Sequence, residues 1–354
     1  MRPFSASLMR AAAMLLLFLA PHPAGALEIL AAGDVTPGYR MTLPAGRQLF
    51  GPAALGRIEG ADLFIWNCET SGRSPREKAN RFVFHVKPEI LPLLALKNGV
   101  ALTANNHVFD GFAEGAADLL DCLGQAGIRA VGLCPGDGDA APGMKAAEAG
   151  DGTPIYLFAS SPMVHERGAL RVPGLQELER GIRAVRELEP KAVIVVCVHD
   201  GIEGRREPSP RQRAWARALA LAGADMLLFA HSHLYGPVET IEAEGRRVLV
   251  AWSLGNFIFG GNRGWQNRKD VRMLSVTRDE GGFHARWIVG RTEGWRFEIP
   301  AAEFIEFVRE PALPEATREG MAPSPASSAP CGEKAPGQED VQPSGPLAAP
   351  PGLQ

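Results

Sequence analysis

Residues 225–233 read Asp-Met-Leu-Leu-Phe-Ala-His-Ser-His, an apolar run that ends in two histidines. Short, continuous apolar runs are typical of strands that are buried on both faces of a parallel sheet. Such a strand places His231 and His233 at the carboxyl edge of the sheet, where open α/β folds build their sites. Two neutral imidazoles permit metal binding without requiring it, because a histidine pair on a loop is also ordinary polar surface.

Other strand-like runs also end in residues that bind metals or transfer protons. The run 27–32 leads into Asp34, and the run 61–66 leads into Asn67 and Glu69. The run 100–103 leads into Asn106, His107 and Asp110, and the run 192–198 leads into His199. Together with the two histidines, these oxygen and imidazole donors form a ligand set for hard to borderline divalent cations. The alternative is a set of unrelated loop residues, but the pattern recurs too often for that interpretation to be favoured.

Helical patterns alternate with these strands. Residues 112–126 and 210–222 carry apolar residues at helical spacing, and glycines at 127 and 223 close them. This order predicts a parallel or mixed sheet with covering helices through about residue 230. The later runs 237–241, 247–252, 271–276 and 283–289 predict mostly antiparallel strands. The expected fold is therefore α/β, a sandwich of two mixed sheets flanked by helices.

The chain ends differ in composition from the region between them. Residues 1–26 carry two arginines, the apolar stretch 11–20 and the small residues Ala24-Gly25-Ala26, which is the order of a cleavable signal peptide. The sequence thus predicts export to the periplasm or the exterior, with an uncleaved membrane anchor as the alternative. Residues 311–354, rich in Pro, Ala and Ser, are expected to be a disordered tail. One domain is then expected over residues 27–310.

Composition excludes some classes of partner. The chain has 354 residues, of which 45% are hydrophobic and 22% charged, so the apolar content suffices for a large core. The net charge is −3 and no basic stripe is present. Nucleic acid is therefore not an expected partner.

A series of short motifs resembles those of the CapA family of poly-γ-glutamate capsule biosynthesis proteins, within the calcineurin-like metallophosphoesterase superfamily. The motifs occupy residues 33–35, 67–70, 105–110, 199–203, 223–233 and 253–259. The most specific are Asn105-Asn106-His107-x-x-Asp110 and Ser253-Leu254-Gly255-Asn256-Phe257. The resemblance covers roughly residues 27–262 and implies a four-layer α/β/β/α sandwich of the metallophosphoesterase type.

The resemblance also implies a division of roles. Two divalent metal ions would hold a phosphate ester and activate a water for attack on phosphorus. Glu69 would bridge them, with Asp34 and His233 on the first ion and with Asn106, His199 and His231 on the second. His107 would protonate or stabilise the leaving oxygen, and Asp110 would orient its imidazole. Such ligands accept manganese, iron and zinc alike.

Further residues are candidates for contacting substrate or supporting the ligands, and each also has a structural interpretation. They are Asn67, Glu203, Arg205, Arg206 and Asn256. Two departures from the resembled pattern alter the expected site. The superfamily's opening Asp-x-His motif is Asp34-Val35-Thr36 here, so one histidine ligand is missing and a site for a single metal ion is an alternative. Asp200 and Gly204 stand where the family usually has Trp and Tyr.

These features leave two functions open. The first is an exported metal-dependent hydrolase that acts on a phosphoester or related bond in capsule or cell-envelope polymer synthesis. The second is a non-hydrolytic accessory or binding protein for an anionic capsule polymer such as poly-γ-glutamate. Either function predicts an anionic polymer or phosphoester as ligand and capsule-synthesis membrane proteins as partners. The retained ligand set favours the first function, and the missing imidazole favours the second.

Overall fold

A computed structural model describes residues 27–38, 41–43, 45–75, 82–136, 142–164, 168–260, 270–293, 295–299 and 305–307. The expected signal peptide, 1–26, and the expected tail, 311–354, lie outside these described residues. Within the described residues, no helix is both long and apolar enough to cross a membrane.

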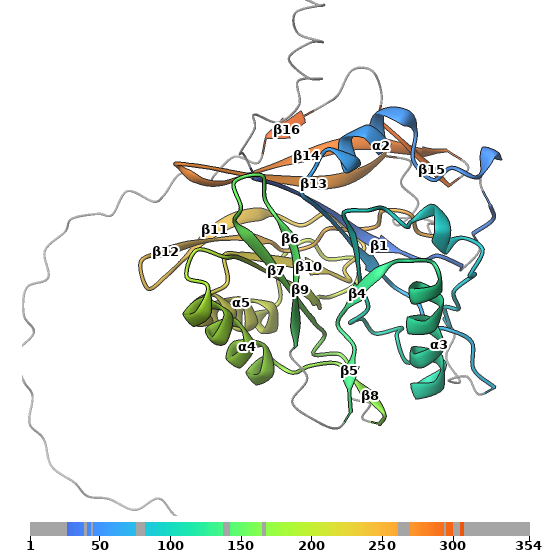
Figure 1. Ribbon diagram of the computed structural model, residues 1–354, viewed down its shortest axis with the longest axis horizontal. Helices are drawn as coiled ribbons and strands as arrows, with labels where there is room; N and C mark the ends of the chain where they lie inside the picture. Colours follow the sequence, from blue (N-terminus) through green and yellow to red (C-terminus); the bar gives the residue numbers. More distant parts are fainter. Residues whose placement is uncertain are drawn as a thin grey trace, which may run out of the picture. The chain divides into compact units, whose positions relative to one another are not determined.

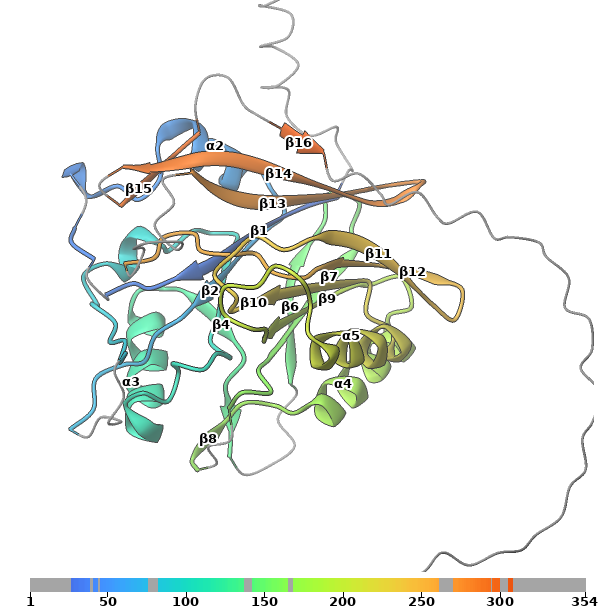
Figure 2. The ribbon, with the colours of Figure 1, turned by 180° about the vertical axis from the view of Figure 1, so that it is seen from behind.

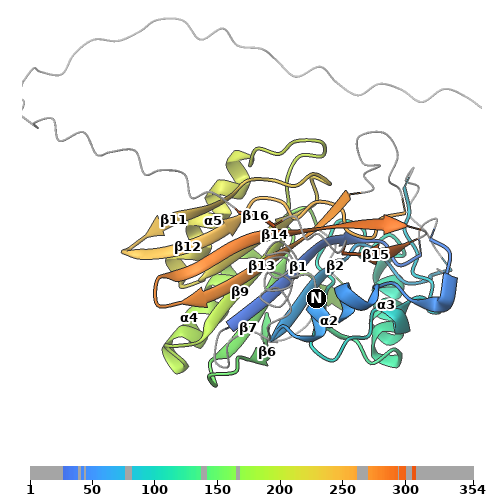
Figure 3. The ribbon, with the colours of Figure 1, turned by 90° about the horizontal axis from the view of Figure 1, so that it is seen from above.

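The N-terminal strands belong to an eight-stranded mixed sheet with the order β15-β14-β13-β1-β2-β3-β4, in which β16 pairs with β14 (Figure 1). Its parallel part consists of β1 (Leu27–Val35), β2 (Leu63–Cys68), β3 (Gly99–Leu102) and β4 (Arg129–Val131). Its antiparallel part consists of β13 (Asp270–Asp279), β14 (Gly282–Glu293), β15 (Arg296–Glu298) and β16 (Ile305–Phe307). The two parts join where β13 pairs antiparallel with β1, and Figure 3 shows these strands side by side.

The second sheet has six strands in the order β11-β12-β10-β9-β7-β6. Its parallel centre consists of β7 (Pro154–Ser160), β9 (Val193–His199), β10 (Met226–Ala230) and β12 (Arg246–Ala251). The edge strands β6 (Gly143–Glu148) and β11 (Val238–Ala243) are antiparallel to their neighbours. A separate two-stranded ladder joins β5 (Cys134–Pro135) and β8 (Leu170–Arg171).

Helices cover the outer face of each sheet. The first sheet is covered by α2 (Pro52–Glu59) and α3 (Phe112–Gln125), with short 3₁₀ turns at η1 (Ala45–Arg47) and η2 (Leu91–Leu93). The second is covered by α4 (Leu175–Leu188) and α5 (Pro210–Ala222), which lie side by side in Figures 1 and 2. At the start of α5, the Ser209 hydroxyl accepts a hydrogen bond from the backbone of Gln212, which caps the helix.

Three apolar cores hold the layers together. Alternate residues of each strand point to opposite faces, so Ile29 packs between the sheets while Leu30 packs against the helices. The central core also contains Val195 and Leu228, and the second outer core contains Leu219 of α5. Burial of each such side chain contributes roughly 1.5–3 kcal/mol. Two sheets between two helical layers form the four-layer α/β/β/α sandwich that the resemblance implies, and this prediction is confirmed.

The sequence predicted most elements near the site and fewer elements far from it. The helices expected at 112–126 and 210–222 are α3 and α5, within one residue at their ends. Strands beyond residue 230 are mostly antiparallel as expected, with β12 as the exception because it pairs parallel with β10. Sequence analysis did not single out α4, which fully buries only Leu178 and Ile182, or the β6–β7 hairpin.

Gly33 in β1 allows a distant loop to lie against this strand. A Cβ atom on Gly33 would lie only 1.8 Å from the carbonyl oxygen of Gly255. The backbone N–H of Asp34 donates to that carbonyl at 2.9 Å, and the N–H of Phe257 donates to the Asp34 carbonyl at 2.9 Å. These bonds place Asn256 beside Asp34 in a parallel bridge.

We expect Gly33→Ala to destabilise the protein by about 1–3 kcal/mol, because the added methyl group must separate β1 from the Gly255 loop. Equilibrium urea unfolding of the full chain measures this change. Gly56→Ala is the matched control, since Gly56 is exposed within α2 and a Cβ there meets no atom within 4 Å. That control should keep or gain stability, by about 0.5–1 kcal/mol. Equal stability of the two variants would contradict the close approach.

Candidate metal centre

The carboxyl ends of strands from both sheets bring a cluster of buried acidic and imidazole side chains together. Asp34 belongs to β1, Glu69 follows β2, His199 ends β9, and His231 and His233 follow β10. Their potential ligand atoms fall into two groups, Glu69 with His199 and His231, and Asp34 with Glu69 and His233. Within each group these atoms lie within 4.8 Å of one another. Glu69 belongs to both groups, which is the arrangement that a bridging carboxylate requires.

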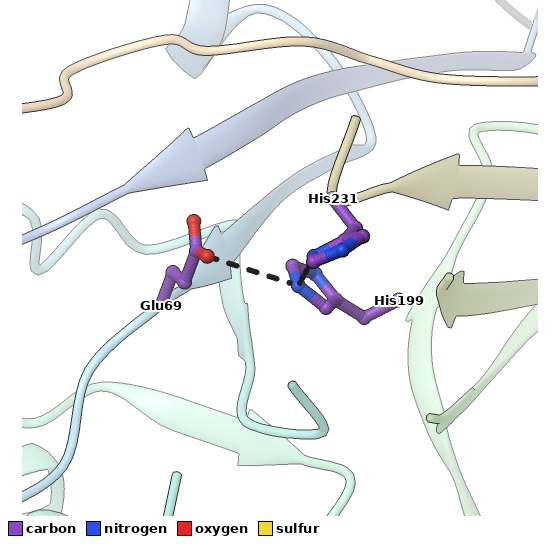
Figure 4. A group of neighbouring side chains, drawn as sticks. All are labelled: Glu69, His199 and His231. Carbon is purple, nitrogen blue, oxygen red and sulfur yellow. Dashed lines mark hydrogen bonds and ion pairs between the residues drawn. The ribbon is translucent and has the colours of Figure 1, made fainter. Parts of the chain in front are cut away.

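Figure 4 shows the first group converging on His199. The Nε2 atom of His199 lies 3.8 Å from Glu69 Oε1 and 3.2 Å from Nδ1 of His231. In the second group, Nδ1 of His233 lies 3.2 Å from Oδ2 of Asp34. Imidazole nitrogens and carboxylate oxygens therefore face common points.

The backbone is strained where it carries the two histidines. His231 has φ 101° and His233 has φ 61°, values that residues other than glycine adopt rarely. Such conformations cost on the order of 1–3 kcal/mol each and persist only where the surroundings hold them. Between them, the Ser232 hydroxyl donates to Ser253 Oγ at 2.9 Å, which ties the strained turn to the segment after β12. Strain of this kind is common at functional sites.

The Glu69 carboxylate lacks hydrogen-bond donors. Both of its oxygens are buried and, among the described residues, accept no hydrogen bond. Burial and the negative charge of Asp34 raise the pKa of Glu69 well above its usual value. A buried carboxylate without a partner is costly, and a bound cation removes that cost. The oxygens and imidazoles present therefore fit divalent metal ions.

The cluster is supported by asparagines from neighbouring motifs. Asn67 Nδ2 donates to Asp34 Oδ1 at 2.8 Å and lies 3.0 Å from His199 Nδ1. Asn256 Oδ1 lies 2.8 Å from Nδ1 of His233. Asn106 Oδ1 lies 2.8 Å from Nε2 of His199, the nitrogen that faces Glu69, so this amide oxygen adds a donor atom to the first group.

The histidines differ in their protonation. Burial lowers the pKa of His199 well below its usual value and that of His231 to about 4. Burial acts in the same direction on His233, but Glu69 and Asp34 outweigh it and raise the pKa of His233 to about 9. His199 and His231 are therefore neutral at pH 7, the form that binds metals, whereas His233 must release a proton on binding one.

His107 and Asp110 form a pair beside the cluster. Nδ1 of His107 lies 2.7 Å from Asp110 Oδ2, and its Nε2 lies 3.9 Å from Glu69 Oε1. The Phe84 ring stacks on the imidazole at 4.0 Å, and the Phe84 N–H donates to Asp110 Oδ2 at 2.9 Å. Phe84 could not be identified from the sequence, because it lies in a segment without any of the quoted motifs. The far nitrogen of His107 thus faces the cluster.

The charged residues after β9 lie at the periphery. Glu203, Arg205 and Arg206 are exposed. The negative charge of Glu203 contributes to the raised pKa of Glu69, after burial and Asp34, so this carboxylate is electrostatically close to the cluster. Arg206 Nη1 donates to the Tyr235 carbonyl at 3.4 Å. Contact of these residues with substrate stays a prediction.

Fold and cluster define an α/β sandwich protein with a buried set of candidate metal ligands. Residues 28–261 match the family described as "Bacterial capsule synthesis protein PGA_cap". The chain belongs to this bacterial capsule synthesis family, so the resemblance to the CapA family is confirmed.

The chain is similar in sequence to two CapA proteins of Bacillus and to a mycobacterial protein. The Capsule biosynthesis protein CapA of Bacillus anthracis is 28% identical over 187 residues, covering 50% of this chain and 44% of that protein. The PGA biosynthesis protein CapA of Bacillus subtilis is 28% identical over 185 residues, covering 51% and 47%. The chain thus spans less than half the length of both. A Mycobacterium tuberculosis protein named "Probable polyglutamine synthesis accessory protein" is 24% identical over 270 residues, covering 69% of each.

Two solved structures align with this chain at low TM-scores. The 5′-nucleotidase from Candida albicans has a TM-score of 0.42 and 10% identity, covering 76% of this chain and 53% of that one. The sulfate thiohydrolase SoxB of Thermus thermophilus has a TM-score of 0.39 and 14% identity, covering 79% and 57%.

We expect Glu69→Gln to have opposite effects on stability with and without metal. In chelator-treated protein it should stabilise the fold by about 1–3 kcal/mol, because the buried carboxylate without donors is removed. With added Mn²⁺ the parent chain should rise in melting temperature while the variant should not. Thermal unfolding of both proteins under both conditions measures this. An equal Mn²⁺-induced rise in the two proteins would contradict the role of Glu69.

Proposed function

We propose that the chain is an exported, metal-dependent hydrolase that cleaves a phosphoester or related bond during synthesis of a capsule or cell-envelope polymer. The observation that carries the proposal is Glu69, a buried carboxylate without hydrogen-bond donors that is shared by two groups of metal-ligand type. A structural core would not leave such a group unsatisfied without compensation. Its position fits a carboxylate that bridges two cations.

Each cation would have its own set of side chains. Asp34 and His233 would hold one, Asn106, His199 and His231 the other, and Glu69 both. Bound divalent cations would supply Lewis acidity toward a phosphoryl oxygen and would lower the pKa of a coordinated water. Asn67 and Asn256 hold Asp34 and His233 in place through the hydrogen bonds described above.

His107 is proposed to act as the general acid. Its Nδ1–H donates to Asp110, which fixes the ring, while Nε2 faces the cluster and is placed to give a proton to a leaving oxygen. Asp110 is held in turn by the Phe84 N–H, so the pair is positioned before substrate arrives.

The proposed substrate is an anionic capsule polymer such as poly-γ-glutamate, or a phosphoester intermediate in its synthesis, with capsule-synthesis membrane proteins as partners. Membership of the capsule synthesis family supports this assignment. Export rests on the signal-like residues 1–26.

A non-hydrolytic accessory role is the second candidate, and Thr36 favours it. Thr36 stands where the superfamily pattern has a histidine, and it is buried and hydrogen-bonded to backbone groups. Its N–H donates to the Ile258 carbonyl at 3.0 Å, and its hydroxyl accepts from the Gly260 N–H at 2.9 Å. One cation would then have fewer ligands than the other. The accessory name of the mycobacterial relative points the same way.

We expect His107→Ala to lower turnover of an aryl phosphodiester or monoester, in the presence of Mn²⁺, on the order of 10²–10⁴-fold with unchanged metal content. Asp110→Asn should produce a smaller loss, because the ring remains but its orientation is weakened. His284→Ala is the matched control, since His284 is exposed and pairs with Asp279 on the β13–β14 hairpin. Full activity in His107→Ala would exclude the acid role, and metal binding without any turnover in the parent chain would favour the accessory role.

A further inference from the structure

Asp200 and Arg211 form an ion pair beside the cluster that the proposed mechanism does not use. Asp200 is fully buried and directly follows His199. Its two carboxylate oxygens accept from different nitrogens of Arg211: Nε donates to Oδ2 at 3.0 Å and Nη2 donates to Oδ1. Arg211 lies in the first turn of α5, and half of its side chain is exposed (50%). A buried carboxylate therefore holds a guanidinium group that reaches solvent.

The backbone around this pair connects it to the candidate ligands. The Asp200 N–H donates to the carbonyl of Ala230, the residue before His231, at 3.1 Å. Gln212, the neighbour of Arg211, donates from Nε2 to the Asp200 carbonyl at 2.9 Å and to the Trp252 carbonyl at 3.2 Å. The start of α5 is thereby tied to the ends of the strands that carry His199 and His231.

The geometry of the pair places the Arg211 charge at the carboxyl edge of the second sheet. Arg211 contacts Asp200, the residue after His199, and the Asp200 N–H is bonded to the residue before His231. A half-exposed guanidinium held there attracts anions to this edge of the sheet.

The way Arg211 is held prepares it for a second acceptor. A guanidinium carries five donors in a rigid plane, and the contact with Asp200 occupies only the edge formed by Nε and Nη2. Because Asp200 fixes the plane, little side-chain freedom remains to be lost when the outer donors bind phosphate or carboxylate oxygens.

We propose that Arg211 is a substrate-binding residue that recognises a negatively charged group next to the bond held at the metal centre. This inference rests on the proposed function. The ligand class is an anion with a free phosphate or carboxylate group, in preference to a neutral ester.

The test is the affinity of the full, Mn²⁺-treated chain for inorganic phosphate, measured by titration calorimetry. Arg211→Gln should weaken phosphate binding on the order of tenfold, because a charge-assisted hydrogen bond is lost, while metal content stays unchanged. Arg213→Gln is the matched control. Arg213 lies on the same helix, is also exposed and pairs with Glu239 at 3.6 Å, so its loss should leave phosphate affinity unchanged.

A purely structural ion pair makes a different prediction. Arg211→Gln would then lower the melting temperature and leave the phosphate affinity of the folded protein at the parent value, which would overturn the proposal. If Arg211→Gln does not fold, Asp200→Asn/Arg211→Gln removes both charges together and is titrated in its place. The Mn²⁺ content of the parent chain is measured separately, and a parent chain without bound Mn²⁺ refutes the metal centre. If such a chain and its Arg211→Gln variant bind phosphate with equal affinity, the role of Arg211 is refuted as well.

Discussion

The structure depends on an electrostatic constraint at the meeting point of its strands. Glu69 and Asp34 place carboxylate oxygens in a buried space where, among the described residues, the oxygens of Glu69 receive no hydrogen bond. Burial and mutual repulsion raise the pKa of Glu69, and the same two carboxylates keep His233 protonated. Protonated His233 therefore places one positive charge beside the two carboxylates, and a bound divalent metal ion would place two. Such an arrangement is costly for folding, and the proposed binding of cations would offset that cost.

The four layers serve this site by bringing together chain segments that are distant in sequence. The central core packs the two sheets face to face, so that β1 and β2 of one sheet end beside β9 and β10 of the other. Gly33 then allows the Gly255 loop to contact β1 directly, which brings Asn256 to His233. The positive φ angles of His231 and His233 are the local cost of this convergence.

Much of the centre was predictable from the sequence because parallel strands end at a common edge. A strand pattern followed by Asp, Glu or His is visible in sequence, and this signal located Asp34, Glu69, His199, His231 and His233. The grouping of these residues around Glu69 came from the family resemblance, since no pattern in one strand specifies its neighbour in another. Their action as ligands stays a prediction.

What the sequence did not reveal depends on tertiary contacts. Phe84 approaches His107 from a segment without regular structure, and no periodicity marks it. Arg211 looked like an ordinary charged residue of an amphipathic helix, and only its contact with buried Asp200 sets it apart. The role of Thr36 was visible only as a missing histidine until its hydrogen bonds to the 258–260 segment were known.

Metal stoichiometry decides whether the carboxylates and histidines at the strand ends hold metal ions. The full chain would be loaded with Mn²⁺, dialysed against metal-free buffer and analysed for elemental content per chain. We predict about two bound ions, with one as the lower limit that the missing histidine at Thr36 allows. A folded chain that retains no metal would refute the metal centre.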